Sequence, residues 1–235
     1  MTYYEEKELH VKSCYSGHRP SMRKSREITY QFLLTKPKSR SERLFILMRV
    51  IGGTLKGRRL SSIKAEDNMI NLRPTSDRVK ENLFNILLGG KFEIKIEQAR
   101  ILDIFAGTGA LGIEAISRGG KSCTFVEKNK SCLKMLNANI SSCNIKDQTS
   151  IKILDATEMP LNSDEAFNLV FLDPPYRRSL GESAIRSALA SNWLSDKALV
   201  VLEEGEKKNY LEGFSLEDVR KYGDTILHFF RKVPD

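Results

Sequence analysis

Residues 101–112 read Ile-Leu-Asp-Ile-Phe-Ala-Gly-Thr-Gly-Ala-Leu-Gly, and this stretch indicates the fold. An apolar run that suits a buried strand leads into three glycines spaced G-x-G-x-x-G, and a helical pattern follows from Leu111. Glycines at this spacing let the backbone approach a ligand closely, and the amino-terminal end of the next helix favours negative charge. The stretch therefore predicts a ligand-binding α/β domain.

The segments on both sides of this loop alternate between strand and helix patterns. Strands are predicted at 100–105, 122–127, 150–154, 167–172 and 198–203, and helices at 111–117, 130–141 and 180–190. This alternation predicts a parallel, doubly wound sheet with helices on both faces. The runs at 214–222 and 225–232 lie too close together for a crossover helix, so they predict an antiparallel hairpin at one edge. We therefore expect an α/β fold with a mostly parallel seven-stranded sheet.

A hairpin and a helix are predicted before the sheet. Residues 49–51 and 54–60 flank Gly52-Gly53, a pair that supplies the positive φ of a tight turn. Residues 73–76, Arg-Pro-Thr-Ser, lead into an amphipathic helix that Thr75 or Ser76 can cap and that Gly89-Gly90 ends. The sequence thus predicts a small hairpin-helix appendage in front of the main sheet.

Positive charge is concentrated at the amino terminus. The 235 residues carry a net charge of +8, of which residues 1–47 contribute +5 and the other 188 residues only +3. Residues 1–43 lack a sustained hydrophobic period, which predicts that most of them are disordered or loosely packed. We therefore divide the chain into a basic, disordered extension at 1–47, a hairpin and helix at 48–90, and an α/β domain at 91–235. One hypothesis is that the native protein starts at Met48.

Several classes of protein are disfavoured by composition. The four cysteines form no C-x-x-C pair and no histidine cluster accompanies them, so we expect neither a metal site nor a disulfide framework. No apolar run approaches the roughly 20 residues that a membrane span needs. The polar amino terminus does not suit a secretory signal. We expect a cytoplasmic protein with no membrane partner and with reduced thiols.

Acidic residues at the strand ends bear on what the glycine loop binds. Glu127 follows Gly107 by 20 residues, where a carboxylate can bind ribose hydroxyls, and Asp155 can accept from an adenine amino group. These features suit a dinucleotide as well as S-adenosylmethionine, or a merely structural turn. Asp103 favours S-adenosylmethionine, because a carboxylate there would repel a pyrophosphate and attract a methionine ammonium. The candidate cofactor-binding residues are Asp103, Phe105, Ala106, Gly107, Thr108, Gly109, Glu127, Lys128, Asp155 and Ala156.

The stretch Asp173-Pro174-Pro175-Tyr176 ends a predicted strand and suits chemistry on a base amine. An exocyclic amine is a poor nucleophile because its lone pair is delocalised into the ring. Acceptors on its N–H groups, here the Asp173 carboxylate and the Pro174 carbonyl, can direct the lone pair toward a methyl group. The prolines pre-set the corner, and Tyr176 can stack on the base for roughly 1–3 kcal/mol. Asp173, Pro174 and Tyr176 are the candidate catalytic residues; an ordinary turn is the alternative.

Four stretches together resemble the bacterial small-subunit ribosomal RNA guanine-N2 methyltransferases of the RsmD type. They are residues 48–53 (Met-Arg-Val-Ile-Gly-Gly), 72–85 (Leu-Arg-Pro-Thr-Ser-Asp-Arg-Val-Lys-Glu-Asn-Leu-Phe-Asn), 102–115 around the glycine loop, and 171–176. The resemblance implies a Rossmann-like class I methyltransferase fold, S-adenosylmethionine as cofactor, and guanine N2 in small-subunit RNA as target. It also implies two pockets: the base pocket contains Asp173, Pro174 and Tyr176, and the cofactor pocket contains Asp103, Gly107, Gly109, Glu127 and Asp155. Residues 1–47 depart from the family pattern.

Basic residues gather in the 48–90 region and could neutralise RNA phosphates. Lys56 and Lys80 belong to this group, although a solvated charged face is the alternative. Arg73 is the strongest candidate, because it precedes Pro74 in an extended stretch from which its side chain can reach a substrate. The candidate RNA-binding residues are Arg49, Arg58, Arg59, Arg73 and Arg78.

Three other functions stay open. An N6-adenine methyltransferase on RNA or DNA would use the same corner, although a sequence-specific DNA enzyme would need a larger target-recognition region. A nicotinamide oxidoreductase is disfavoured by Asp103 and by the proline corner. A non-catalytic RNA-binding module would not need an intact base pocket. We expect a monomeric enzyme whose partner is ribosomal RNA, within the small ribosomal subunit.

Overall fold

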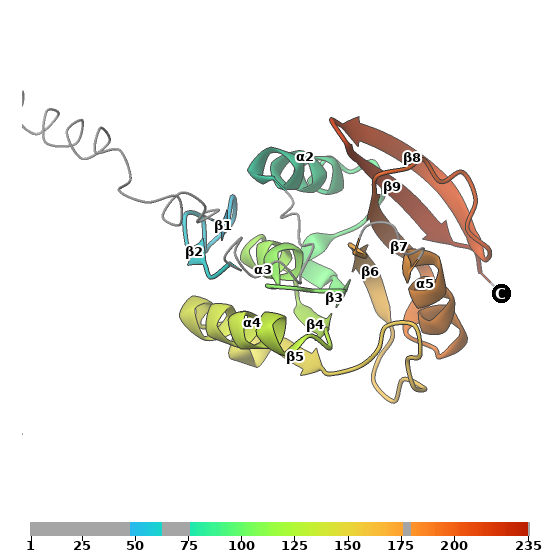
Figure 1. Cartoon of the computed structure of the whole chain (residues 1–235). Helices are drawn as coiled ribbons and strands as arrows, with labels where there is room; N and C mark the ends of the chain where they lie inside the picture. Colours follow the sequence, from blue (N-terminus) through green and yellow to red (C-terminus); the bar gives the residue numbers. More distant parts are fainter. Residues whose placement is uncertain (1–47, 63–75, 176–179, 235) are drawn as a thin grey trace, which may run out of the picture. The chain divides into compact units, whose positions relative to one another are not determined.

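The computed structural model describes residues 48–62, 76–175 and 180–234 (Figure 1). One sheet has the strand order β5-β4-β3-β6-β7-β9-β8. Its strands are β3 (Arg100–Ile104), β4 (Ser122–Val126), β5 (Thr149–Lys152), β6 (Phe167–Leu172), β7 (Leu194–Glu204), β8 (Phe214–Tyr222) and β9 (Thr225–Lys232). The first five in chain order pair in parallel, and β9 runs antiparallel to β7 and to β8. The predicted seven-stranded sheet with an antiparallel edge hairpin is confirmed.

The strand order reverses between β3 and β6, which places two loops side by side. β3 pairs with β4 on one side and with β6 on the other, so that Asp103 is in register with both Phe125 and Phe171. The carboxyl ends of β3 and β6 therefore meet at the edge where open α/β sheets bind ligands. The glycine loop after β3 and the proline corner after β6 both leave from this edge.

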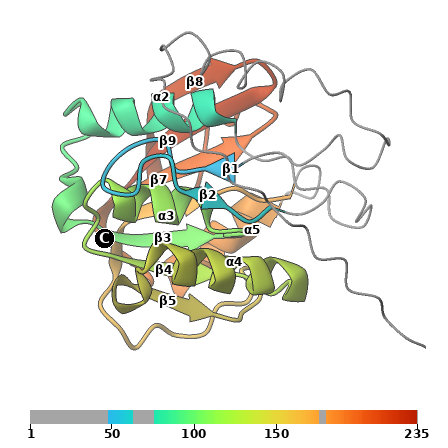
Figure 2. The same cartoon turned by 90° about the vertical axis from the view of Figure 1, so that its left-hand side faces the viewer.

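Helices cover both faces of the sheet (Figures 1 and 2). The helices are α2 (Asp77–Leu88), α3 (Ala110–Ser117), α4 (Lys130–Cys143) and α5 (Leu180–Ala190). Apolar side chains of α2, α3 and α4 share one buried cluster with alternate strand residues such as Ile101 and Phe171. Those of α5 share a second cluster with the intervening residues, such as Leu102 and Leu172. The two clusters follow from the period of two that every strand imposes on its side chains.

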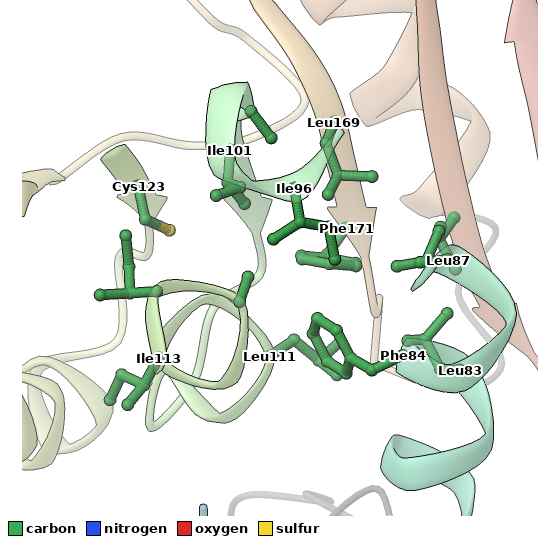
Figure 3. Close-up of a cluster of buried hydrophobic side chains, with 14 of the residues drawn as sticks. Leu83, Phe84, Leu87, Ile96, Ile101, Leu111, Ile113, Cys123, Leu169 and Phe171 are labelled. Carbon is green, nitrogen blue, oxygen red and sulfur yellow. The ribbon is translucent and has the colours of Figure 1, made fainter. Parts of the chain in front are cut away.

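Helix α2 packs into the first of these clusters (Figure 3). The Ser76 side chain accepts from the Val79 amide at 3.3 Å, and the helix ends at Gly89, as the sequence predicts. Leu83, Phe84 and Leu87 are fully buried, and the Phe84 and Phe171 rings lie 5.7 Å apart. The helix therefore shares its core with the sheet, while the division of the chain at residues 47 and 90 stays a prediction.

The hairpin differs from its predicted form. Strands β1 (Met48–Arg49) and β2 (Arg59–Leu60) pair over two residues each, so the connection runs from Val50 to Arg58 and Gly52-Gly53 is not a two-residue turn. The reason is that the backbone around the glycines bonds to α3. Gly53 has a φ of 74°, and a β-carbon on it would lie 1.8 Å from the Ser117 carbonyl oxygen. The glycines are needed for close contact with a helix.

Candidate functional site

The glycine loop is a tight turn with three left-handed residues. Phe105, Gly107 and Gly109 have φ angles of 60°, 57° and 82°. A β-carbon on Gly109 would lie 2.5 Å from the Leu136 side chain, and one on Gly112 would lie 2.4 Å from the Phe125 ring. At Gly107 the nearest atom would be 3.9 Å away, so this glycine borders open space. Phe105 is a non-glycine residue in a conformation that bulky residues rarely adopt.

Glu127, after β4, holds this loop in place. Its carboxylate accepts from the Gly107 amide at 2.9 Å, and from the amides of Lys128 and Asn129 at 2.8 and 2.7 Å. A carboxylate offers about four acceptor positions, so these three bonds leave room for a further donor. The structure thus brings together the first glycine and the acidic residue that the spacing of 20 predicted to face one site.

Asp103 lies beneath the loop with an exposed fraction of 2%. Its carboxylate accepts from the Gly112 amide at 2.9 Å and so fastens the start of α3 to β3. Burial raises the pKa of Asp103, the Gly112 bond opposes this rise, and the charge of Glu127 adds to it, so that the resulting pKa is about 8. Asp103 therefore has a structural contact that the sequence did not predict.

Asp155, after β5, is engaged by two neighbours. One carboxylate oxygen accepts from the Lys128 ammonium, and the other accepts from the Thr157 amide at 3.0 Å and the Thr157 hydroxyl at 2.8 Å. The Lys128 bond is the main reason why the pKa of Asp155 falls to about 2. Ala156 is buried beside it. A ligand amine at Asp155 would share an acceptor that is already occupied by Lys128.

The proline corner begins where β6 ends. The Asp173 amide donates to the Ile104 carbonyl at 3.5 Å, Pro174 is buried, and Gly181 at the start of α5 packs against Pro174. Burial raises the pKa of Asp173 well above its usual range, and the charges of Glu203 and Asp103 add to this shift. Tyr176, the third candidate catalytic residue, lies outside the described residues.

Glu203 is a site residue that the sequence reasoning missed. It follows Leu202 on β7, and Leu202 is in register with Leu172, the residue before Asp173. Because paired residues of parallel strands point to the same face, Glu203 and Asp173 lie next to each other on neighbouring strands. Its exposed fraction is 4%. The sequence signal that could have identified Glu203 is an acidic residue at the end of the apolar strand predicted at 198–203.

The predicted RNA-binding residues that the structure describes lie on the hairpin and on α2. Arg58 and Arg59 are exposed at β2, and Arg78 is exposed on α2. Arg49 on β1 is 59% exposed and pairs with Asp77 at 2.9 Å. Arg73 lies outside the described residues.

Lys80 does not belong with these exposed residues, so its predicted role in phosphate binding is wrong. It is 1% exposed, and its ammonium donates to the Arg49 carbonyl at 2.7 Å. Burial lowers its pKa, against the opposing charges of Glu114 and Asp77. The side chain therefore fastens α2 to the hairpin.

Within the described ranges, no group of three or more histidine, cysteine, aspartate or glutamate side chains could hold a metal ion. In the same part of the chain, no helix combines the length and hydrophobicity needed to cross a membrane. Cys123, Cys132 and Cys143 are buried free thiols.

Comparisons with known proteins cover nearly all the described part of the chain. A family model described as "Conserved hypothetical protein 95" matches residues 48–231. Ribosomal RNA small subunit methyltransferase D of Haemophilus influenzae is 39% identical over 165 residues, which are 68% of this chain and 80% of that protein. The protein of the same name from Escherichia coli is 35% identical over 66% of this chain and 74% of its own length.

Solved structures agree with this match. The Escherichia coli protein yhhF, described as a candidate methyltransferase, has a TM-score of 0.66 and 30% identity, and it covers 80% of this chain and 99% of its own. A candidate methylase from Haemophilus influenzae, HI0767, has a TM-score of 0.62 and 31% identity over the same shares.

Proposed function

The chain belongs to the conserved hypothetical protein 95 family, and on this premise we propose that it methylates the N2 amine of a guanine in small-subunit ribosomal RNA, using S-adenosylmethionine. Relatives named as ribosomal RNA methyltransferases support the reaction class and a cofactor of the S-adenosylmethionine type. The observation that carries the proposal is the juxtaposition of the glycine loop and the proline corner at one edge of the sheet.

The glycine loop fits the cofactor. Gly107 borders open space, and the amino-terminal end of α3 favours the methionine carboxylate. Glu127 retains an acceptor position for a ribose hydroxyl after its three backbone bonds. Asp103 lies on β3 one residue before the strand ends, where it would meet the ammonium, and Asp155 follows β5, where it bonds to Lys128. S-adenosylmethionine supplies a methyl group on a positively charged sulfur.

The corner fits a base amine. The amine nitrogen forms a bond to the methyl carbon while the bond from that carbon to sulfur breaks, and the nitrogen loses one proton. Asp173 and the Pro174 carbonyl would accept from the two N–H groups and align the lone pair. A carboxylate with a raised pKa also accepts a proton more readily, which suits Asp173 to receive the proton that leaves. Tyr176 would stack on the base.

The hairpin supports contact with a polyanion. Arg49 and Arg59 are cross-strand partners, and like charges placed opposite each other destabilise a strand pair unless an anion lies nearby. Asp77 supplies part of that negative charge, because its carboxylate pairs with Arg49. RNA phosphates would supply the rest, at this pair and at Arg58 and Arg78, which are both exposed. We also propose that the enzyme acts as a cytoplasmic monomer.

Methylation with labelled S-adenosylmethionine followed by nucleoside mass spectrometry tests the proposal. Small subunits from cells that lack the enzyme should acquire label as N2-methylguanosine. Label in N6-methyladenosine would replace the proposal with the adenine alternative, and no transfer to any nucleic acid would refute both.

Glu127→Ala should weaken cofactor binding by about 1.5–3 kcal/mol, the cost of losing a charged acceptor. The loss has two parts, because the ribose loses an acceptor and the Gly107 amide loses its anchor. Isothermal calorimetry with S-adenosylmethionine measures it. Glu158→Ala, an exposed glutamate on the loop after β5, is the control. Equal affinity in both variants would remove Glu127 from the site.

Protein-bound small subunits should be methylated faster than protein-free ribosomal RNA. Residues 48–235 carry a net charge of only +3, so general phosphate attraction is weak and a shaped surface must supply recognition. The target base must also be unpaired or flipped to reach Asp173, so duplex RNA should be the poorest substrate. Turnover on the three substrates at one salt concentration tests this. Equal or faster methylation of protein-free RNA would show that the enzyme reads local sequence.

A further inference from the structure

The hairpin and the two residues that follow it, residues 48–62, form an arm. One end of the arm contacts the glycine loop directly, and the other end is linked to the loop through a third residue. At one end, the Thr108 hydroxyl donates to the Met48 sulfur at 3.7 Å. At the other end, the arm reaches the loop through Asn139 of α4, which is 1% exposed. The arm and the loop are therefore in contact through buried groups, although some 50 residues separate them in sequence.

Asn139 makes three hydrogen bonds that join two segments. Its side-chain oxygen accepts from the Ser61 amide at 2.7 Å. Its side-chain NH₂ donates to the Ser61 carbonyl at 3.2 Å and to the Thr108 carbonyl at 2.8 Å. A planar amide with one acceptor and two donors matches this set of partners. Thr108 lies between Gly107 and Gly109, so the third bond fixes the backbone that would face the cofactor.

We propose that Asn139 is a positioning residue that couples the arm to the glycine loop, so that RNA held by the arm and cofactor held by the loop strengthen each other's binding. The identity of the two ligands rests on the proposed function, but the coupling itself is a property of the chain. Coupling between two sites is reciprocal, so a disturbance of the arm must loosen the loop. If the coupling passes through Asn139, then displacing the arm should no longer loosen the loop once the Asn139 side chain is removed.

The arm also docks on α3 at a place that does not touch the glycine loop. The Thr54 amide donates to the Ser117 carbonyl at 2.7 Å, and the Leu55 amide donates to the Ser117 hydroxyl at 2.9 Å. Gly53 lies against this helix, and an added β-carbon would collide with the Ser117 carbonyl. Gly53→Ala therefore displaces the arm without altering any group of the loop, which makes it a suitable perturbation.

Residue-resolved hydrogen exchange of the loop amides tests the coupling. Gly107 and Gly109 report on the loop, since their amides bond to Glu127 and to the Ala106 carbonyl. Gly53→Ala should speed their exchange by at least about 5-fold, the lower end of typical coupling between sites. In a protein that already carries Asn139→Ala, adding Gly53→Ala should not speed the exchange of the Gly107 and Gly109 amides any further. The measurement needs no ligand, so its failure is distinct from a failure of the proposed function.

Asn137→Ala is the matched control for Asn139→Ala. It removes an exposed asparagine of the same helix whose side chain, among the described residues, bonds to the Leu133 carbonyl alone. In this background Gly53→Ala should act as it does in the native chain. If Gly53→Ala prevents folding, Gly52→Ala replaces it, because the new β-carbon would meet the Arg118 side chain, which can shift.

Two results would overturn the inference. Unchanged exchange at Gly107 and Gly109 in the arm variant would show that the arm and the loop are independent. A full effect of Gly53→Ala in the Asn139→Ala background would show that the coupling bypasses Asn139 and runs through the Met48–Thr108 contact or through α3.

Discussion

Asp173→Ala should lower the methyl-transfer rate by about 10²–10³-fold, the usual cost of removing one group that is aligned with the reacting atoms. S-adenosylmethionine should still bind with near-native affinity, because the groups proposed to hold it lie on β3 or follow β3, β4 and β5. Single-turnover assays on small subunits and calorimetry with the cofactor measure the two effects separately. Asp147→Ala, which removes an exposed aspartate after α4, is the control and should change neither.

Asp173→Asn separates the charge of Asp173 from its shape. The amide oxygen can still accept a hydrogen bond, so this variant should keep more activity than Asp173→Ala. Because burial and the charges of Glu203 and Asp103 raise the pKa of Asp173, its acid form persists to higher pH than usual. The native rate should therefore rise with pH as Asp173 ionises, and the Asp173→Asn rate should lack this rise. Near-native turnover in Asp173→Ala would mean that the corner is structural.

The loops of the site were predictable because their residues lie close together in sequence. The glycines, the acidic residue 20 positions later and the proline corner each follow a strand. Parallel strands place their carboxyl ends at one edge of the sheet, so the meeting of these loops follows from the strand order. The Ser76 cap and the end of α2 at Gly89 were predictable for the same reason, since capping is a local interaction.

The contacts that fix the arm could not be read from local patterns. Glu114 bonds to Ile51 across 63 residues, and Asn139 bonds to Ser61 across 78. Nothing near Glu114 in the sequence distinguishes it from a solvent-facing helical glutamate. The tight turn predicted at Gly52-Gly53 failed for this reason, because the amides expected to pair across a hairpin bond to α3 instead.

The burial of Lys80 illustrates the same point. Eight basic residues lie between positions 49 and 80, and nothing in the sequence marks Lys80 as a buried residue that donates to the Arg49 carbonyl. Burying an ammonium is unfavourable unless charges and hydrogen bonds compensate it. Asp77, 3.8 Å away, and Glu114 supply that compensation. Only the fold brings these groups together.

Glu114→Ala should lower the free energy of unfolding by about 3–5 kcal/mol, the usual cost of breaking a buried ion pair by removing one partner. Glu114 is fully buried on α3, and one of its oxygens accepts from the Ile51 amide at 2.7 Å. The other accepts from the Gly52 amide at 2.8 Å and from the Arg118 guanidinium at 2.7 Å. The substitution leaves two backbone donors and a cation, whose side chain is 10% exposed, without their acceptor.

Glu182→Ala is the matched control, because Glu182 and Arg186 on α5 have the same i,i+4 spacing as Glu114 and Arg118. Their side chains are 48% and 52% exposed, so water replaces the lost partner and the expected cost is below about 1 kcal/mol. Urea unfolding followed by circular dichroism compares the two variants with the native protein. The loss of unfolding free energy in Glu114→Gln should lie between the losses in Glu114→Ala and Glu182→Ala. The glutamine amide keeps one acceptor oxygen, but its NH₂ group places two donors against a backbone N–H. A loss in Glu114→Ala no larger than in Glu182→Ala would mean that α3 does not depend on the docked arm, and that Arg118 finds another acceptor when the carboxylate is gone.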